Sequence, residues 1–106
     1  GTNSMATNAM VKAGAKRAAT GENAIGFCAA RAQIITGPIG ILVANAMLGE
    51  ITPTIAESVG TSEAPKELVP TAYCNVMIAG TKELPVKECI EDAVDRIVRM
   101  YSRGNN

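Results

Sequence analysis

The 106-residue sequence predicts one α/β domain, in which helices pack on a small, mostly parallel sheet. Three observations support this fold class. Segments with apolar residues at helical spacing alternate with short apolar runs that are typical of buried strands. Hydrophobic residues make up 47% of the chain and charged residues 19%, which is typical of a packed globule rather than a disordered tail. The length suits a single core, and with only 3% aromatic residues that core is aliphatic.

Two helices are predicted at the start of the chain. Apolar residues recur at helical spacing over residues 5–15, with Asn3 or Ser4 available as N-cap and Gly14 as a stop. The hydroxyl of Thr20 can cap a second helix that extends to about residue 32. Its expected apolar stripe consists of Ile25, Cys28, Ala29 and Ala32.

The middle of the chain contains the first predicted strand. Residues 33–36 form a short β-branched run closed by Gly37 and Pro38, which favours a buried parallel strand over another helical turn. The apolar segment 41–51 fits the start of a helix or irregular buried structure equally well.

The second half contains another helix and two more strands. Thr52 and Pro53 form a strong helix start, with a capping hydroxyl and proline in the first turn, and Gly60 marks the end. Residues 66–70 and 74–79 then read as short strands.

The last helix has the clearest pattern in the sequence. Pro85 opens it, and Gly104 ends it. One stripe is apolar, and the opposite face is charged. The apolar stripe consists of Val86, Cys89, Ile90, Ala93, Val94, Ile97, Val98 and Tyr101.

Composition excludes several kinds of chemistry. The chain contains no histidine, so neither a Ser–His nor a Cys–His pair can form within it. The three cysteines lie far apart without a Cys-x-x-Cys motif, so we expect neither a disulfide framework nor a metal site. We expect Cys28, Cys74 and Cys89 to be buried free thiols in a reducing cytosol.

Charge and hydropathy argue against nucleic acid and membranes as partners. The charges of the ten basic and ten acidic residues cancel, whereas proteins that bind nucleic acid or membrane surfaces need a net positive charge. The longest apolar stretch, residues 34–48, is interrupted by glycine and proline and is shorter than the roughly 20 residues that span a bilayer. No secretory leader is evident, so we expect a cytoplasmic protein.

Glycine-rich and hydroxyl-rich turns are the candidate binding elements. The segment from Gly37 to Gly40 follows the predicted strand, where free backbone N–H groups can hold a phosphate or carboxylate. The alternative is a tight turn that needs glycine only for its dihedral angles. The segment from Thr20 to Asn23 has suitable groups for oxygen anions or a ribose, or is simply a helix start.

Two polar residues interrupt the apolar segment that follows. Asn45 and Glu50 would cost on the order of a few kcal/mol if buried without a partner, so we expect each to bond to backbone or to a ligand. Residues 1–49 carry four basic groups and one acidic group, and residues 50–106 carry six basic and nine acidic groups. This asymmetry favours an anionic ligand on the first half or reflects a solvated face.

Six collinear strings resemble a family of bacterial proteins catalogued as domain of unknown function 3842. They are GTN at Gly1–Asn3, MVKAGA at Met10–Ala15, ATGENAI at Ala19–Ile25, GPIGI at Gly37–Ile41, MLGEITP at Met47–Pro53 and CNV at Cys74–Val76. The resemblance extends from Gly1 to about Ile97. It implies a three-layer, Rossmann-like α/β fold without an assigned activity.

The resemblance also implies a departure. Members of that family carry, before the Gly1–Asn3 string, a strand, a glycine-rich turn and a helix that resemble a dinucleotide-binding opening. This sequence starts where the second strand of such a fold would finish. Either it is a fragment without that phosphate loop, or nucleotide binding is in doubt. A core without its first strand leaves a sheet edge or face uncovered, which demands a partner.

These observations lead to two hypotheses. The first is a protein that binds a nucleotide, dinucleotide or other small phosphate- or carboxylate-bearing ligand at the carboxyl edge of the strands. The second is a non-catalytic homo-oligomer or scaffold. We assign no catalytic residue, and whether the protein is an enzyme stays open. The expected ligand-binding residues are Gly1, Thr2, Asn3, Thr20, Gly21, Glu22, Asn23, Gly37, Pro38, Ile39, Gly40, Asn45 and Glu50.

Overall fold

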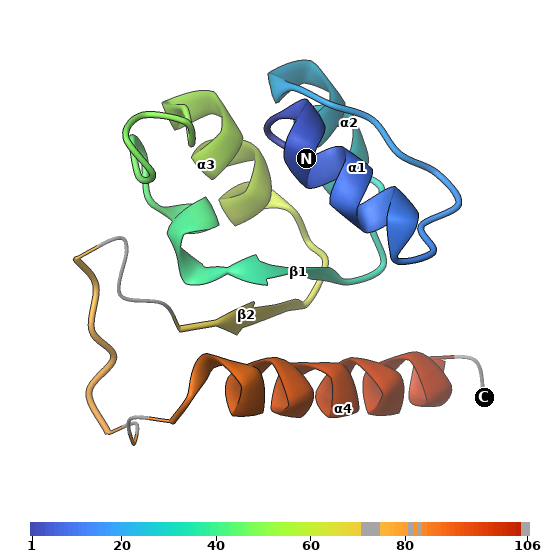
Figure 1. Ribbon diagram of the computed structural model, residues 1–106, viewed down its shortest axis with the longest axis vertical. Coiled ribbons are helices and arrows are strands. Elements are labelled where there is room, and N and C mark those ends of the chain that lie inside the picture. The colour runs from blue at the N-terminus through green and yellow to red at the C-terminus, as the bar shows by residue number, and fades with distance from the viewer. Residues whose placement is uncertain (71–74, 81, 83, 105–106) are drawn as a thin grey trace.

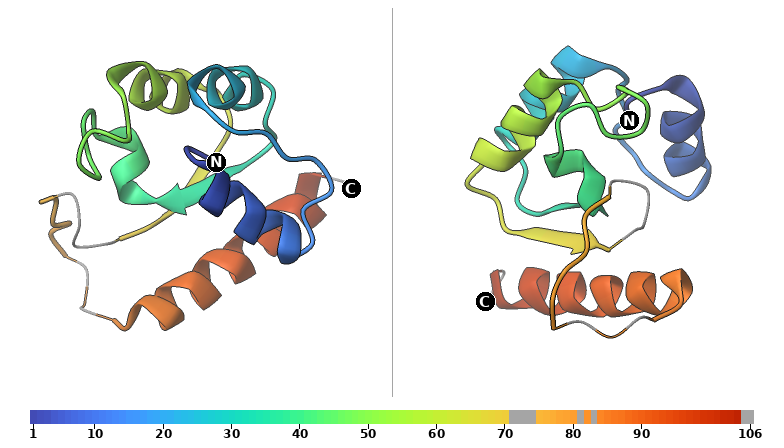
Figure 2. Two further views of the ribbon diagram at one scale, coloured as in Figure 1. Left: turned by 45° about the horizontal axis from the view of Figure 1, so that its top comes forward. Right: turned by 90° about the vertical axis from the view of Figure 1, so that its left-hand side faces the viewer.

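The computed structural model describes residues 1–70, 75–80, 82 and 84–104 (Figure 1). Helices α1, α2 and α3 lie on one side of a two-stranded sheet, and α4 runs along the other side (Figures 1 and 2). The elements are α1 (Ser4–Lys12), α2 (Glu22–Ala29), β1 (Ile35–Pro38), the 3-10 helix η1 (Ile39–Leu42), α3 (Pro53–Thr61), β2 (Lys66–Val69) and α4 (Val86–Gly104).

The two strands are parallel. Ile35 pairs with Lys66 at one end of the ladder and Pro38 with Val69 at the other. The chain crosses between the strands through η1 and α3, as parallel pairing requires. The α/β class is therefore confirmed. Two strands do not establish the three-layer, Rossmann-like sheet that the resemblance implies.

Strand predictions were correct for two of the three segments. The second strand lies where it was predicted. The first begins later than predicted and includes Gly37 and Pro38, because both pair with β2 instead of forming a turn. The predicted strand at 74–79 is wrong where it can be compared, since residues 75–80 form no strand, while Cys74 lies outside the described residues.

Cap chemistry explains where α1 and α3 begin. The Asn3 side chain accepts a hydrogen bond from the Ala6 N–H at 2.8 Å, and the Thr52 hydroxyl accepts one from the Ile55 N–H at 3.2 Å. Pro53 occupies the first turn of α3. All three assignments agree with the sequence prediction.

Helix α2 begins differently from the prediction. Its N-cap is Gly21, whose φ of 111° is a left-handed value that favours glycine, and no side chain in the described part of the chain caps the helix. The hydroxyl of Thr20 instead donates to Thr7 Oγ1 at 2.7 Å. The helix also ends at Ala29, short of residue 32, and Cys28 is exposed.

The hydrophobic core lies between the 41–51 segment and α3. Ile51 is only 1% exposed and packs in one cluster with Ala46, Ile55 and Ala56. Irregular buried structure, one of the two alternatives for residues 41–51, therefore holds for part of the segment. The predicted apolar face of α1 is wrong: Met5 is 83% exposed, and the buried residue is Thr7.

Helix α4 occupies the predicted range, but little of its apolar stripe is covered. Ala93 is buried against the rest of the domain, and Cys89 and Ile97 are half-buried. Among the described residues, no helix is long and apolar enough to cross a membrane.

Candidate site at the junction of three helix N-termini

Hydrogen bonds bring the N-terminal ends of α1, α2 and α3 together. Three chain segments meet there, Gly1–Asn3, Ala19–Asn23 and Glu50–Thr52, and we call this region the N-terminal junction. The region lies near the point marked N in Figures 1 and 2, away from α4. Because each helix N-terminus carries partial positive charge, the junction gathers three such charges on one side of the domain.

Gly1 connects the first two segments. Its ammonium donates to the Ala19 carbonyl at 2.9 Å, and its own carbonyl accepts from the Gly21 N–H at 3.0 Å. A Cβ on Gly1 would lie 2.7 Å from Thr7 Oγ1 and 2.9 Å from the Thr7 backbone nitrogen. This close approach to the backbone explains why the position suits glycine.

Thr7 was missed as a site residue by the sequence analysis. It is buried, accepts a hydrogen bond from Thr20 and donates to the Asn3 carbonyl at 3.1 Å. The available signal was a hydroxyl on the first predicted helix at a position that the apolar stripe did not explain.

Glu50 closes the junction from the third segment. Its carboxylate accepts a hydrogen bond from the Thr2 hydroxyl at 2.5 Å and another from the Asn3 side-chain amide. Asn3 thereby caps α1 with its oxygen and holds Glu50 with its nitrogen. The hydrogen bonds from Thr2 and then Asn3 stabilise the charged form and lower the pKa of Glu50.

Glu22 makes the corresponding contact between α2 and α3. The Thr52 hydroxyl donates to its carboxylate at 2.5 Å while accepting from the first turn of α3. Thr52, which the sequence analysis identified only as a cap, therefore also positions Glu22. The Glu50 and Glu22 carboxylates therefore both accept hydrogen bonds from hydroxyl groups at the N-terminal junction.

The N-terminus of α2 retains free donors. The first helical N–H with an acceptor belongs to Ile25, which donates to the Gly21 carbonyl at 3.0 Å. Within the described structure, the backbone N–H groups of Glu22, Asn23 and Ala24 have no acceptor. Among the described residues, no atom would lie within 4 Å of a Cβ placed on Gly21, so the space beside this N-cap residue is open.

The chain matches the family described as "Domain of unknown function (DUF3842)" over residues 1–102. It belongs to that family. No curated protein and no solved structure matches it. The match confirms the family resemblance of the six sequence strings, and the description of the family gives no activity to this DUF3842 domain.

The segment that carries Glu50 has an unusual backbone. Asn45, Met47 and Leu48 all have left-handed φ values, of 65°, 58° and 58°. Such conformations cost about 1–3 kcal/mol each in non-glycine residues and cluster at functional sites. Asn45 and Glu50 are both exposed, and the hydrogen bonds that Glu50 accepts come from the side chains of Thr2 and Asn3 and not from the expected backbone groups. The Asn45 N–H instead closes the segment by donating to the Ile51 carbonyl at 2.7 Å.

In the described part of this DUF3842 domain, hydrogen bonds connect only some of the residues that were predicted to bind a ligand. The hydrogen-bonded junction contains Gly1, Thr2, Asn3, Thr20, Gly21, Glu22 and Glu50, with Asn23 in the same turn as Glu22. Gly37–Gly40 share no hydrogen bond with it in the described structure, whereas Asn45 is joined to it through its backbone N–H, which donates to the Ile51 carbonyl. Gly37 and Pro38 belong to β1, and Ile39 and the buried Gly40 begin η1.

Acidic side chains and cysteines are the other groups in this sequence that could take part in metal or thiol chemistry. Across the ranges that the structure describes, no three His, Cys, Asp or Glu residues gather closely enough to hold a metal ion. Cys28 is an exposed free thiol and Cys89 a half-buried one, so the prediction of buried thiols is wrong for Cys28. Cys74 lies outside the described residues.

The lowered pKa of Glu50 predicts acid sensitivity. The carboxylate stabilises the folded state above its ordinary pKa of about 4.3, and this contribution is lost as pH falls through the lower folded-state pKa. Glu50→Gln should therefore unfold at a lower temperature than the wild type at neutral pH, and the two melting curves should converge in acid. Circular dichroism melts across this range measure the difference.

Glu57→Gln is the matched control because Glu57 is exposed on α3 and its carboxylate makes no hydrogen bond within the described residues. It should follow the wild-type pH profile. A gap between Glu50→Gln and wild type that stays constant down to about pH 3 would contradict the prediction.

Proposed function

We propose that this domain binds a small molecule through a phosphate or carboxylate group at the N-terminus of α2. The observation that carries the proposal is the set of free N–H groups in the first turn of this helix, at Glu22, Asn23 and Ala24. Backbone donors and the positive end of the helix dipole act together on an anion at such a position.

The contrast among the three helices supports this assignment. Side-chain oxygens of Asn3 and Thr52 already occupy the N-termini of α1 and α3. The corresponding position at α2 is Gly21, which has no side chain to offer and leaves the approach open. An external oxygen anion would supply the missing acceptor.

The surroundings narrow the ligand class. Glu22 and Glu50 are negatively charged acceptors beside the proposed anion position, so they would repel a ligand with many negative charges. A ligand that combines one phosphate with hydroxyl or amino donors avoids this repulsion, because its donors can face the carboxylates. Nucleotides and dinucleotides have this combination, with ribose hydroxyls near the phosphate.

Calorimetric titration tests the proposal, with AMP, NAD, inorganic phosphate and citrate as probes. Asn23→Asp adds a negative charge to the first turn of α2 and should weaken binding of the best probe about tenfold, which corresponds to about 1.4 kcal/mol. The helix should persist, because an acidic residue is favourable in a first turn.

Asn8→Asp is the matched control, since it makes the same change at an exposed position farther along α1. It should leave affinity nearly unchanged. No binding of any probe by the wild type, or equal losses in both variants, would overturn the proposal.

We also propose that the domain forms a homodimer through α4, because one apolar stripe on this helix is uncovered. Its members are Val86, Ile90, Val94, Val98 and Tyr101, each 48–57% exposed. A continuous exposed apolar surface of this kind marks an interaction site.

A second copy is the partner that the chemistry favours. The net charge of zero means that two copies do not repel each other. An antiparallel pair centred on Val94 places each Ile90 beside a Val98 of the second copy, and each Lys87 near a Tyr101 ring. The stripe is then self-complementary around a twofold axis, and the two helix dipoles oppose each other. Light scattering should give a mass of twice 11.0 kDa at micromolar concentration.

A further inference from the structure

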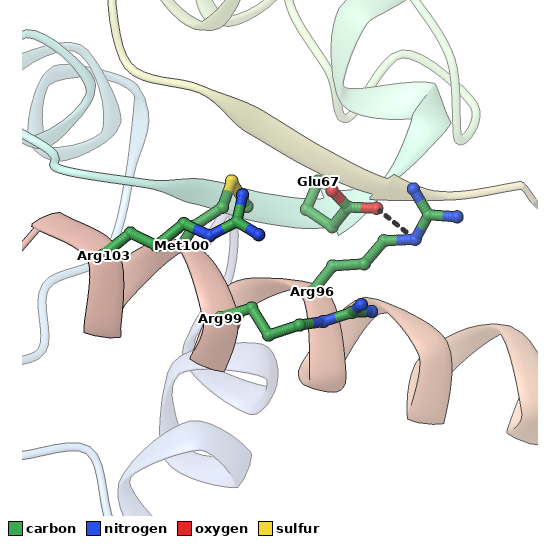
Figure 3. Close-up of a pocket in the computed structure, with 5 residues that line it drawn as sticks. All are labelled: Glu67, Arg96, Arg99, Met100 and Arg103. Carbon is green, nitrogen blue, oxygen red and sulfur yellow. Dashed lines mark ion pairs between the residues drawn. The ribbon is translucent and has the colours of Figure 1, made fainter.

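We infer that the face of α4 turned toward β2 is a second anion site, which binds a chain of phosphate groups. Three arginines of α4, Arg96, Arg99 and Arg103, line a pocket of about 350 Å³ with Met100 and with Glu67 of β2 (Figure 3). We call these three side chains the α4 arginine cluster. It lies across the sheet from the N-terminal junction, so this inference stands apart from the proposed function.

The cluster has an arrangement that suits phosphate. Its members follow each other at intervals of three and four residues, so they lie on one side of the helix. Each guanidinium is a rigid fork of N–H donors that matches two phosphate oxygens. From Arg96 to Arg103 the helix rises by about 10 Å, at 1.5 Å per residue. That span exceeds a single phosphate group and suits a chain of two or three.

The charges within the pocket are only partly matched. Arg96 contacts the Asp92 carboxylate at 2.8 Å and the Glu67 carboxylate at 3.7 Å. Arg99 donates to the Asp95 backbone carbonyl at 3.3 Å. In the described part of the chain, neither Arg99 nor Arg103 pairs with a carboxylate. Two of the three guanidiniums that line the pocket are therefore without a carboxylate partner among the described residues.

Arginines near the C-terminal end of a helix also complement the helix dipole, but the dipole does not require all three of them to line one pocket. A positive charge anywhere around the last turns would serve the dipole equally well. Here all three arginines line the same pocket as Glu67, whose side chain is 23% exposed. Glu67 contacts one of the three arginines, Arg96. An incoming phosphate would displace the Glu67 carboxylate from this contact.

The experiment uses the full chain and inorganic tripolyphosphate as the probe, followed by calorimetry. Arg99→Gln/Arg103→Gln should weaken tripolyphosphate binding at least tenfold without lowering the melting temperature, since both side chains are exposed. Lys87→Gln removes a positive charge from the other end of α4 and should change affinity less than twofold. Glu67→Gln should strengthen binding severalfold, because Arg96 loses its competing carboxylate from β2.

Further probes distinguish the source of the phosphate chain. Equal affinity for tripolyphosphate and ATP, lost together in the double variant, assigns the phosphate chain alone as the ligand. Tighter binding of ATP with the same dependence on Arg99 and Arg103 assigns a nucleoside triphosphate. The inference is overturned if tripolyphosphate does not bind, if monophosphate binds as tightly with the same dependence on Arg99 and Arg103, or if Lys87→Gln weakens binding as much as the double variant. Asn23→Asp should leave tripolyphosphate binding unchanged, which separates this site from the N-terminal junction.

Discussion

Replacing Ile51 with alanine should lower the free energy of unfolding by about 2–5 kcal/mol. Ile51 is 1% exposed and packs against Ala46, Ile55 and Ala56. Removing three carbon atoms there forfeits their burial and leaves a cavity that the small alanine neighbours cannot fill. Because domains of this kind have about 5–15 kcal/mol of stability in total, the loss is a large share of it.

Urea unfolding followed by circular dichroism measures this effect. Leu48→Ala is the matched control because it lies three residues earlier in the same segment and its side chain is fully exposed. It should change the free energy of unfolding by less than about 0.5 kcal/mol. Equal losses for the two variants would show that the segment does not contribute the core that the structure assigns to it.

Features that depend on neighbouring residues could be predicted from the sequence. Asn3 and Thr52 cap their helices because a short side-chain oxygen reaches an N–H three residues on, a requirement met within one turn. The last helix was equally clear, since its apolar stripe recurs regularly from Val86 to Tyr101. These signals are local, so the sequence alone contains them.

Features that depend on residues far apart in the sequence could not be predicted in this way. Thr20 has the chemistry of a cap, but its hydroxyl is taken by Thr7, which α1 buries in place of its methionines. Gly37 and Pro38 have the composition of a turn, but pairing with β2 extends the strand through both. In each case a contact made far along the chain outweighs the local preference.

The candidate site also combines local features, which could be predicted from the sequence, with distant contacts, which could not. Glycines and hydroxyls at helix starts could be identified one by one, and Glu50 stood out as a polar interruption in an apolar segment. Which of these segments meet could not be identified, because the bond between Thr2 and Glu50 spans 48 residues. The missing cap of α2 also depends on tertiary structure, since a hydroxyl precedes this helix in sequence but points elsewhere.

The second large expected effect concerns the association of two copies through the uncovered apolar stripe of α4. Val94→Glu should convert the proposed dimer into a monomer, with the mass from light scattering falling to 11.0 kDa. In an antiparallel pair centred on this residue, the substitution places two carboxylates against each other on the twofold axis. Burying them without partners costs several kcal/mol, and each kcal/mol lowers the association constant about fivefold.

The position of the substitution decides what the experiment tests. Val94 is 51% exposed, whereas the adjacent Ala93 is 6% exposed in the contact with the sheet. A carboxylate at 94 should therefore leave the helical circular dichroism signal and the fold of each copy intact. Thr54→Glu adds the same charge at an exposed position of α3 and should leave the dimer unchanged. A wild-type monomer across micromolar concentrations, or a Val94→Glu dimer as stable as the wild type, would remove α4 as the interface, since the stripe would then have no second copy to cover it.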